Sequence, residues 1–288
     1  MRLAKARRIV SLALVFPAFT VGSAVLSATL PLVHLATPDR RRAVRRSQTI
    51  MHRALGAVSD LVRVLDLVRF DRRAHATDDL PPGPCVLVAN HPTLVDVIQV
   101  LACYDRTCVV AKREHIERHL VGAALRCAGH IDGGDGQLED AQRVIDECLA
   151  RLTDGYSVLI FPEGTRSPVG DMHAFHRGAF EIAARAGVPV VPLAISCEPP
   201  ALKKGMPWHA LAQTGADYAI ERLAPVAVAR GRASTRAAAV SVRELIVSAE
   251  KRLRLAHGAA ERVAGVVTGP SPQGGYAEAG SEARHGGA

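Results

Sequence analysis

The hydrophobic pattern divides the chain into three parts, beginning with an apolar segment near the amino terminus. Ile9 to Ala36 contains 28 residues without Asp, Glu, Lys or Arg. A straight helix of that length would measure about 42 Å, which exceeds the bilayer's hydrocarbon core of about 30 Å. We therefore predict a membrane anchor over residues 1–38.

The geometry of this anchor stays open, because basic residues flank it on both sides, in 2–8 and again in 40–46. The positive-inside rule therefore favours neither orientation of the anchor across the membrane. Pro17 and Pro31 could kink the helix, so a re-entrant helix is an alternative to a full span. A cleaved signal peptide is a further alternative, although its apolar stretch is typically about 7–15 residues long.

The second part, residues 39–76, is predicted to be a basic amphipathic helical segment. Asp39 to Arg73 carries ten arginines and four aspartates. Its apolar residues recur at helical spacing and form one stripe: Met51, Leu55, Val58, Val62 and Leu65. Such a helix could lie on anionic lipid or pack on the following domain.

The third part, residues 77–264, alternates short apolar runs with helical patterns. Buried strands are predicted at 85–89, 108–111, 157–161 and 190–196, and helices at 114–128, 138–152 and 233–257. This alternation predicts an α/β domain with a mostly parallel central sheet flanked by helices. Residues 265–288 are rich in Gly, Ala, Ser and Pro and are predicted to be a disordered tail.

The composition narrows the possible partners. A net charge of +8 favours an anionic surface, such as a membrane or an acidic carrier protein. With 4% aromatic residues, the chain has few stacking platforms, so we expect no nucleic-acid partner. The six cysteines form no Cys-x-x-Cys pair and no zinc pattern, which predicts reduced thiols in a cytosolic compartment and no metal site.

Candidate chemistry begins where the first predicted strand ends, at Asn90-His91. Asp96 follows His91 by five residues, about one turn into the next predicted helix, where its carboxylate can approach the imidazole. A neutral histidine accepts a proton near pH 7, and a carboxylate on its far nitrogen fixes the tautomer and stabilises the cation. The pair predicts a general base with its orienting group, although an ordinary acidic residue at a helix start is the structural alternative.

A second polar turn, Phe161-Pro-Glu-Gly-Thr-Arg-Ser, follows another buried strand. Gly164 permits close backbone approach, Thr165 offers a hydroxyl, and Arg166 offers a fork that matches phosphate oxygens. A solvated turn with an internal ion pair between Glu163 and Arg166 is the alternative.

Together the two motifs resemble the glycerolipid acyltransferases, the lysophosphatidic acid acyltransferase family. The later blocks Phe175-His-Arg-Gly-Ala-Phe and Gly187-Val-Pro-Val-Val-Pro-Leu agree with that family, and the resemblance covers roughly residues 84–196. It implies catalysis by His91 and Asp96. It also implies an acceptor site formed by Glu163, Gly164, Thr165 and Arg166, to which Lys112 and Arg177 could contribute.

The resemblance further implies transfer of a fatty acyl group from acyl-CoA or acyl carrier protein to a lysolipid hydroxyl, most directly that of 1-acylglycerol 3-phosphate. These thioesters are co-substrates, so we expect no bound cofactor. The expected partners are membrane lipid and, as an alternative donor, acyl carrier protein. The expected location is the cell membrane, with the active site on the cytoplasmic side.

One segment departs from the family pattern. Family members usually carry an arginine after an Ile-Asp pair, whereas this chain has Ile131-Asp132-Gly133. The departure keeps open an acceptor without glycerophosphate, as in polyene or unusual-lipid synthesis. Two further alternatives are a hydrolase in which water replaces the alcohol and a non-catalytic membrane-binding module.

Overall fold

A seven-stranded sheet forms the centre of the computed structural model, in the order β1-β7-β6-β2-β5-β3-β4. The structure describes residues 2–75, 80–135, 138–168, 170–200 and 211–267. Neighbouring strands are parallel except for β6 and β7, which are antiparallel. The strands are β1 (Val68–Arg69), β2 (Val86–Ala89), β3 (Thr107–Ala111), β4 (Ile131–Asp132), β5 (Ser157–Ile160), β6 (Val190–Glu198) and β7 (Ala216–Arg222).

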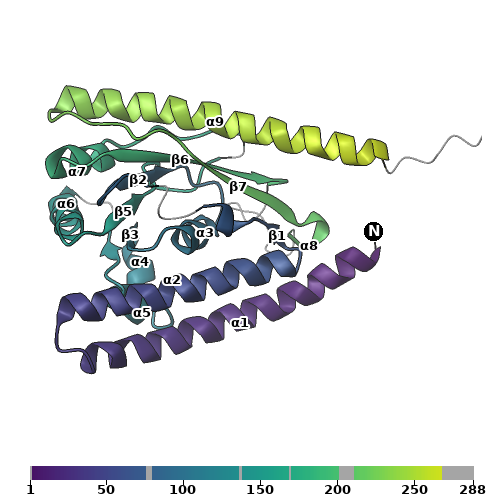
Figure 1. Cartoon of the computed structure of the whole chain (residues 1–288), viewed down its shortest axis with the longest axis horizontal. Helices are drawn as coiled ribbons and strands as arrows, with labels where there is room; N and C mark the ends of the chain where they lie inside the picture. Colours follow the sequence, from purple (N-terminus) through teal and green to yellow (C-terminus); the bar gives the residue numbers. More distant parts are fainter. Residues whose placement is uncertain (1, 76–79, 136–137, 169, 201–210, 268–288) are drawn as a thin grey trace, which may run out of the picture.

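Helices cover both faces of this sheet, as Figure 1 shows. One face carries α6, α7 and α9, and the other carries α3 and α2, with α1 outermost. The helices are α1 (Arg2–Leu35), α2 (Arg40–Val64), α3 (Asp96–Cys103), α4 (Arg113–Ile116), α5 (Gly122–Cys127), α6 (Leu138–Thr153), α7 (Gly178–Ala186), α8 (Leu211–Thr214) and α9 (Arg232–Val267), with a 3₁₀ turn η1 (Arg72–Ala74). The predicted α/β class with a mostly parallel sheet flanked by helices is confirmed.

The centre of the sheet is apolar because its strands are covered on both faces. All four residues of β2 are fully buried between β5 and β6. Such a continuous apolar run is typical of a central parallel strand. The rigid core therefore ends at Ala89, and the polar residues that follow emerge at the carboxyl edge of the sheet.

The predicted helix over 114–128 is wrong, because two short helices, α4 and α5, occupy this segment. The chain folds back tightly between them. A Cβ on Gly122 would lie 2.1 Å from the carbonyl oxygen of Ile116, so only glycine fits there. Arg126 donates to the same oxygen, which satisfies a group that a continuous helix would have bonded internally.

Helix α1 lies along the domain and makes polar contacts near both of its ends. Arg8 Nε donates to Asp66 Oδ2 at 3.0 Å, and His34 Nε2 donates to the carbonyl oxygen of Cys127 at 2.9 Å. Among the described residues, 5–35 form the one helical stretch long and apolar enough to cross a membrane. In its most apolar window 11% of the residues are buried, so most of this apolar surface faces outward.

Helix α2 packs on the domain. Met51 is buried, and Leu55, Val62 and Leu65 pack against the main core. Of the two alternatives for this apolar stripe, packing on the domain is therefore the observed one. The arginines Arg41, Arg42, Arg45 and Arg46 of α2 remain exposed, and Arg41 forms a 2.9 Å ion pair with Asp154.

The carboxyl end of the described chain is helical. Helix α9 runs through Val267, so the first three residues of the predicted tail belong to this helix. Residues 268–288, the rest of that predicted tail, lie outside the described residues.

Candidate active site

The site begins at Asn90, the first residue after β2. Its side-chain amide pairs with the backbone of Ile195 as a neighbouring strand would. Nδ2 donates to the carbonyl oxygen at 2.9 Å, and Oδ1 accepts from the amide N–H at 2.7 Å. Asn90 thus continues the sheet by one residue and fixes the point at which His91 leaves it.

The predicted contact between His91 and Asp96 is present. Nδ1 of the imidazole donates to Asp96 Oδ2 at 2.8 Å. Because Nδ1 carries the proton in this bond, the lone pair lies on Nε2. The side chain of His91 is 19% exposed, whereas Asp96 is fully buried. This arrangement holds the tautomer that a general base requires.

Asp96 was predicted about one turn into a helix, and this placement is wrong, because α3 begins at Asp96 itself. The preceding turn folds back onto the carboxylate. Thr93 donates its backbone N–H to Oδ2 at 2.7 Å and its hydroxyl to Oδ1. These bonds stabilise a turn outside the helix, so the helix starts later than Pro92 suggests.

One partner of Asp96 comes from a distant part of the chain. The Tyr218 hydroxyl, on β7, donates to Asp96 Oδ1 at 3.0 Å. Tyr218 was not predicted from the sequence, since a tyrosine in a strand pattern is usually a core residue. The antiparallel pairing of β7 with β6 brings it to the site, and no local motif signals it.

The imidazole is also held from the neighbouring strand. Phe161, the first residue after β5, stacks on His91 with ring centroids 4.3 Å apart and an interplanar angle of 28°. Since β5 pairs with β2 in parallel, the two strand ends deliver the two rings to the same place. The stacking restricts rotation of the imidazole about its side-chain torsions.

Glu163 connects the two motifs. The residue is 4% exposed. Its Oε1 accepts from the His91 backbone N–H at 3.1 Å and from the Ser167 hydroxyl at 2.6 Å, while Oε2 accepts from the His173 backbone N–H at 2.8 Å. Both oxygens therefore bind protein donors, and the carboxylate joins the histidine turn to the second turn.

The rest of the second turn lies nearer the surface. Gly164 is exposed and has φ +68°, a left-handed conformation that favours glycine. Thr165 and Arg166 are half-buried. Ser167 donates its backbone N–H to the His91 carbonyl oxygen at 2.8 Å, so the end of the second turn adjoins the histidine.

The two remaining predicted cations lie at the same edge of the sheet. Lys112 directly follows β3, which pairs in parallel with β5, and it is exposed. Arg177 directly precedes α7, next to His176, whose N–H donates to the Pro162 carbonyl oxygen at 2.9 Å. Arg177 is exposed and forms a 3.4 Å ion pair with Glu181. The direct role of each cation in binding stays a prediction.

The residue after β4, where the sequence departs from the family pattern, is closely packed. A Cβ on Gly133 would lie 3.0 Å from the carbonyl oxygen of Ala111, so a larger residue would require a shift of a few tenths of an ångström. Arg113, the first residue of α4, reaches into this region, but it pairs with Asp132 at 3.3 Å and Asp140 at 2.7 Å. Its charge is therefore balanced by acidic side chains of the protein.

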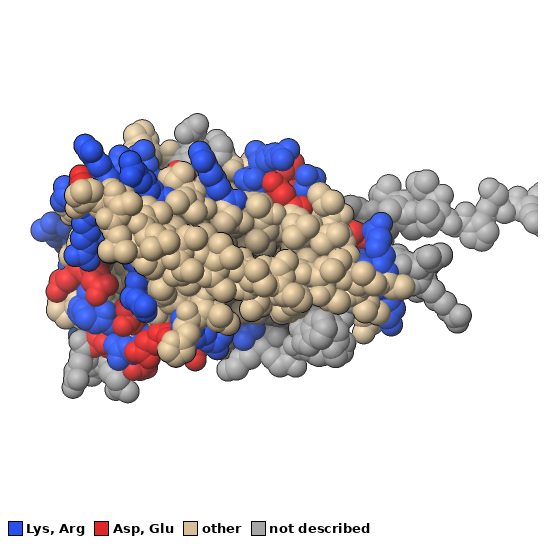
Figure 2. Space-filling view, turned by 90° about the horizontal axis from the view of Figure 1, so that it is seen from below, with Lys and Arg blue, Asp and Glu red and all other residues tan. Residues whose placement is uncertain are grey.

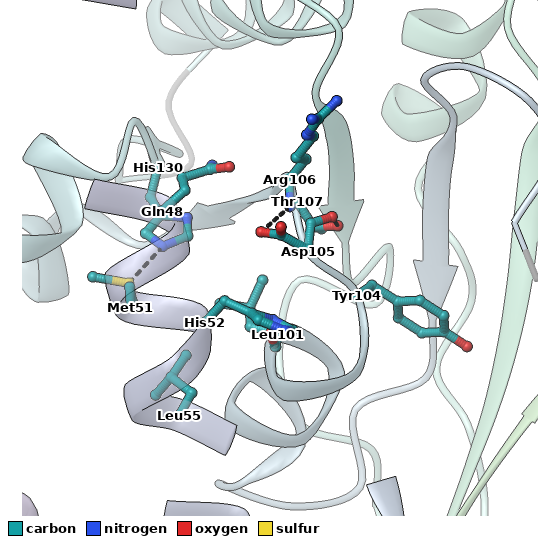
Figure 3. Close-up of a pocket in the computed structure, with 10 residues that line it drawn as sticks. All are labelled: Gln48, Met51, His52, Leu55, Leu101, Tyr104, Asp105, Arg106, Thr107 and His130. Atoms are coloured by element: carbon teal, nitrogen blue, oxygen red, sulfur yellow. Dashed lines mark hydrogen bonds between the residues drawn. The ribbon is translucent and has the colours of Figure 1, made fainter. Parts of the chain in front are cut away.

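A small cavity at the opposite edge of the sheet is shown in Figure 3. It lies beside Thr107, the first residue of β3, and its volume of about 10 Å³ has room for about one water molecule. His130 in its wall accepts from the Val109 N–H, and burial lowers the pKa of this imidazole to about 4. The cavity is too small for a lipid or an acyl chain.

The fold and the site together define an α/β protein with a histidine base at the carboxyl edge of a parallel sheet. The imidazole is oriented by a buried carboxylate, and its outward nitrogen is free to accept a proton. Such a site can remove a proton from a hydroxyl group.

Comparison with known proteins shows which family the central part of the chain resembles. Residues 71–196 match the family model described as Acyltransferase. Over 138 residues the chain is 35% identical to the 1-acyl-sn-glycerol-3-phosphate acyltransferase of Pseudomonas aeruginosa, covering 46% of this chain and 52% of that protein. Over 118 residues it is 38% identical to the alpha form of the enzyme of that name from Homo sapiens, covering 40% and 42%.

A solved structure shares the fold. The crystal structure of the 1-acyl-sn-glycerophosphate acyltransferase PlsC from Thermotoga maritima aligns with a TM-score of 0.62 at 21% identity, covering 87% of this chain and 98% of that one. The chain spans about half the length of the curated relatives it matches. Residues 71–196 are thus similar to the acyltransferase family, which confirms the resemblance inferred from the two motifs.

Proposed function

We propose that this protein transfers a fatty acyl group from an acyl thioester to the hydroxyl of a lysolipid, most directly 1-acylglycerol 3-phosphate, in phospholipid biosynthesis. The observation that carries the proposal is the 2.8 Å bond between His91 Nδ1 and the buried Asp96, which leaves Nε2 as the base. The relatives named 1-acyl-sn-glycerol-3-phosphate acyltransferase support this choice of acceptor.

In the proposed reaction, Nε2 of His91 takes the proton of the acceptor hydroxyl while the oxygen attacks the thioester carbonyl carbon. The C–S bond then breaks, and the leaving thiolate takes the proton from the imidazolium. No acyl-enzyme forms. Asp96 stabilises the imidazolium, and base catalysis of this kind contributes roughly 10²–10⁴-fold.

We assign the acceptor's phosphate to the cationic surface beside the second turn. Arg166 would supply charge-assisted bonds to phosphate oxygens, with Lys112 and Arg177 as further cations. Glu163 acts differently in this proposal, because its oxygens already accept three protein bonds. It supports the turn and does not touch the acceptor.

A second candidate, an acceptor without glycerophosphate, is favoured by one observation. The position at which family members usually carry an arginine is Gly133, so this cation is missing from the chain. This candidate keeps the same base and the same thioester chemistry, and differs only in the head group of the acceptor.

An acyl-transfer assay separates these candidates. Purified protein would be given lysolipids with phosphate, with substituted phosphate and without phosphate, each with acyl-CoA and with acyl carrier protein as donor. We expect transfer to 1-acylglycerol 3-phosphate, with kcat/KM at least tenfold above that for the unphosphorylated acceptor. Equal use of both acceptors would favour the second candidate, and thioester loss without transfer would indicate a hydrolase.

Arg166→Ala tests the phosphate assignment within the same assay. Removing a charge-assisted bond, worth about 1.5–3 kcal/mol, should raise the acceptor KM at least tenfold while the donor KM stays nearly constant. Arg185→Ala is the matched control, because Arg185 lies in α7 and pairs with Glu181 at 2.7 Å. A fall in kcat without a change in KM would contradict the assignment.

We also propose that α1 attaches the protein to a membrane by lying along its surface, with the active site on the cytoplasmic side. Its outward face is apolar, and the exposed residues include Leu14, Val21, Val25 and Leu32. Figure 2 shows this face as a broad uncharged band bordered mainly by lysines and arginines, with some acidic residues among them. An apolar band with a basic border fits an anionic lipid surface. The polar contacts near both ends of α1 support a retained helix that lies flat on the domain.

Substitutions on this face test the membrane proposal. Val21 is 62% exposed, so Val21→Glu leaves the fold intact while placing a charge where lipid would be. We expect vesicle binding to fall at least tenfold, measured by sedimentation with vesicles of phosphatidylcholine and phosphatidylglycerol.

The matched control for Val21→Glu is Val240→Glu, on α9 at the opposite side of the molecule. Val240 is 54% exposed, so the change is chemically the same and equally tolerated by the fold. Its vesicle binding should equal that of the wild type. Equal binding by both variants would contradict attachment through α1.

A further inference from the structure

The carboxylate of Asp96 accepts four hydrogen bonds, and they come from two sources. Three of them are local, since His91 and Thr93 lie in the turn just before α3. The fourth comes from Tyr218, which is 122 residues away in the sequence and is 3% exposed. Among the described residues, Tyr218 is thus the link between this carboxylate and the far part of the sheet.

We propose that Tyr218 is a positioning residue for the general base: its hydroxyl fixes the Asp96 carboxylate and sets how strongly the His91–Asp96 pair holds a proton. The proposal rests on the proposed acyl transfer, because it assigns a role within the same site. It adds a third member, from β7, to the two residues that the sequence motif provides.

The tyrosine ring is itself held rigidly. Phe70 packs against it edge to face, with centroids 5.2 Å apart, and Cys197 on β6 is its partner in the strand register. Strand β6 also carries Ile195, which binds Asn90 at the start of the histidine turn. The same strand pairs with β7, which carries Tyr218. Hydrogen bonds from Thr93 in the turn and from Tyr218 in the sheet therefore both restrict rotation of the Asp96 carboxylate.

The hydroxyl is suited to act as a permanent donor. Burial, together with the adjacent Asp96 charge, raises the pKa of Tyr218 well above its usual value, so the group stays protonated. The other titratable groups around it are the thiols of Cys103 and Cys197, and burial raises the pKa of Cys103 to about 12. On the β5 side, Glu163 binds the backbone of His91.

A hydrogen bond donated to a carboxylate stabilises its charged form. Without the Tyr218 hydroxyl, Asp96 Oδ1 would keep only the Thr93 hydroxyl as a donor, and the coupled pair would bind a proton more tightly. The proton that blocks the base would then be lost only at higher pH. The carboxylate would also be free to rotate away from the imidazole.

Tyr218→Phe tests the proposal, since it removes the hydroxyl and keeps the packed ring. We expect kcat to fall about tenfold, both KM values to stay constant, and the acid limb of the kcat/KM profile to move to higher pH. Tyr156→Phe is the matched control, because Tyr156 is 5% exposed and its hydroxyl interacts with Arg45 at the amino end of β5. This variant should retain the wild-type kcat and pH profile.

A second measurement does not depend on the reaction. In protein labelled with ¹⁵N-histidine, the His91 resonances are assigned with His91→Gln, and the imidazole is titrated by NMR. We expect a higher His91 pKa in Tyr218→Phe than in the wild type. An unchanged pKa with an unchanged acid limb would overturn the role of Tyr218. Absence of acyl transfer by the wild type would instead overturn the proposed function and leave the NMR result standing.

Discussion

Replacing His91 with alanine should reduce acyl transfer by about 10²–10⁴-fold, because the other described side chains that bond to Asp96, those of Thr93 and Tyr218, are hydroxyl donors and cannot replace the imidazole as base. The fold should persist, since His91 lies at a strand end where the side chain is partly exposed. The loss should appear in kcat, and both KM values should change little, because the imidazole acts on the proton and does not hold either substrate. Steady-state kinetics with saturating thioester measure both quantities.

Two comparisons sharpen this result. His91→Gln retains a donor toward Asp96 but offers no base, so its kcat should be as low as that of the alanine variant. Added imidazole should restore part of the activity of His91→Ala only, because that variant leaves a space beside Phe161. Wild-type turnover by purified His91→Ala would exclude the proposed mechanism.

The parts of this site that the sequence predicted correctly depend on local spacing. An apolar run ended by Asn90-His91 predicts a strand end, and the strand β2 ends at Ala89. Asp96 reaches the imidazole because five residues suffice to complete a turn, whether or not that turn is helical. The contact was therefore predictable, although the placement of Asp96 within a helix was wrong.

The parts that the sequence did not predict depend on tertiary pairing. Tyr218 reaches Asp96 only because β7 runs antiparallel to β6, and a strand pattern does not reveal which neighbour it will pair with. Glu163 was predicted to hold the acceptor through the family resemblance. Its burial and its three protein bonds were not visible in a turn that reads as polar.

Helix α2 shows why amphipathic patterns leave a choice open. A stripe such as Met51 to Leu65 fits lipid and a protein core equally well, because both are apolar. Whether the stripe contacts lipid or protein depends on how the helices pack in the folded domain. Here the stripe of α2 faces the core, while α1 presents its apolar residues outward. The predicted anchor at 1–38 thus corresponds to a helix with an exposed apolar face, and the contact of this face with lipid stays a proposal.

The second large effect is expected for Glu163→Gln, which keeps the size of the side chain and removes its charge. One of the two oxygens becomes an amide that can only donate, so either the His91 backbone N–H or that of His173 loses its acceptor. A hydrogen bond to a buried charged group is worth about 1.5–3 kcal/mol, so we expect the free energy of unfolding to fall by about that amount. Because the same carboxylate positions the backbone of His91, kcat should fall at least tenfold.

Glu181→Gln is the matched control for Glu163→Gln, because it makes the same chemical change at the surface. Glu181 pairs with Arg177 and Arg185 within α7, and surface pairs of this kind contribute about 0.3–0.5 kcal/mol. Denaturant unfolding and steady-state kinetics of both variants then distinguish two roles for Glu163. Loss of stability and of kcat together supports a carboxylate that holds the two turns in place. A higher acceptor KM at unchanged stability would instead make Glu163 a direct ligand of the acceptor, because only a residue that touches the acceptor changes its affinity without weakening the fold.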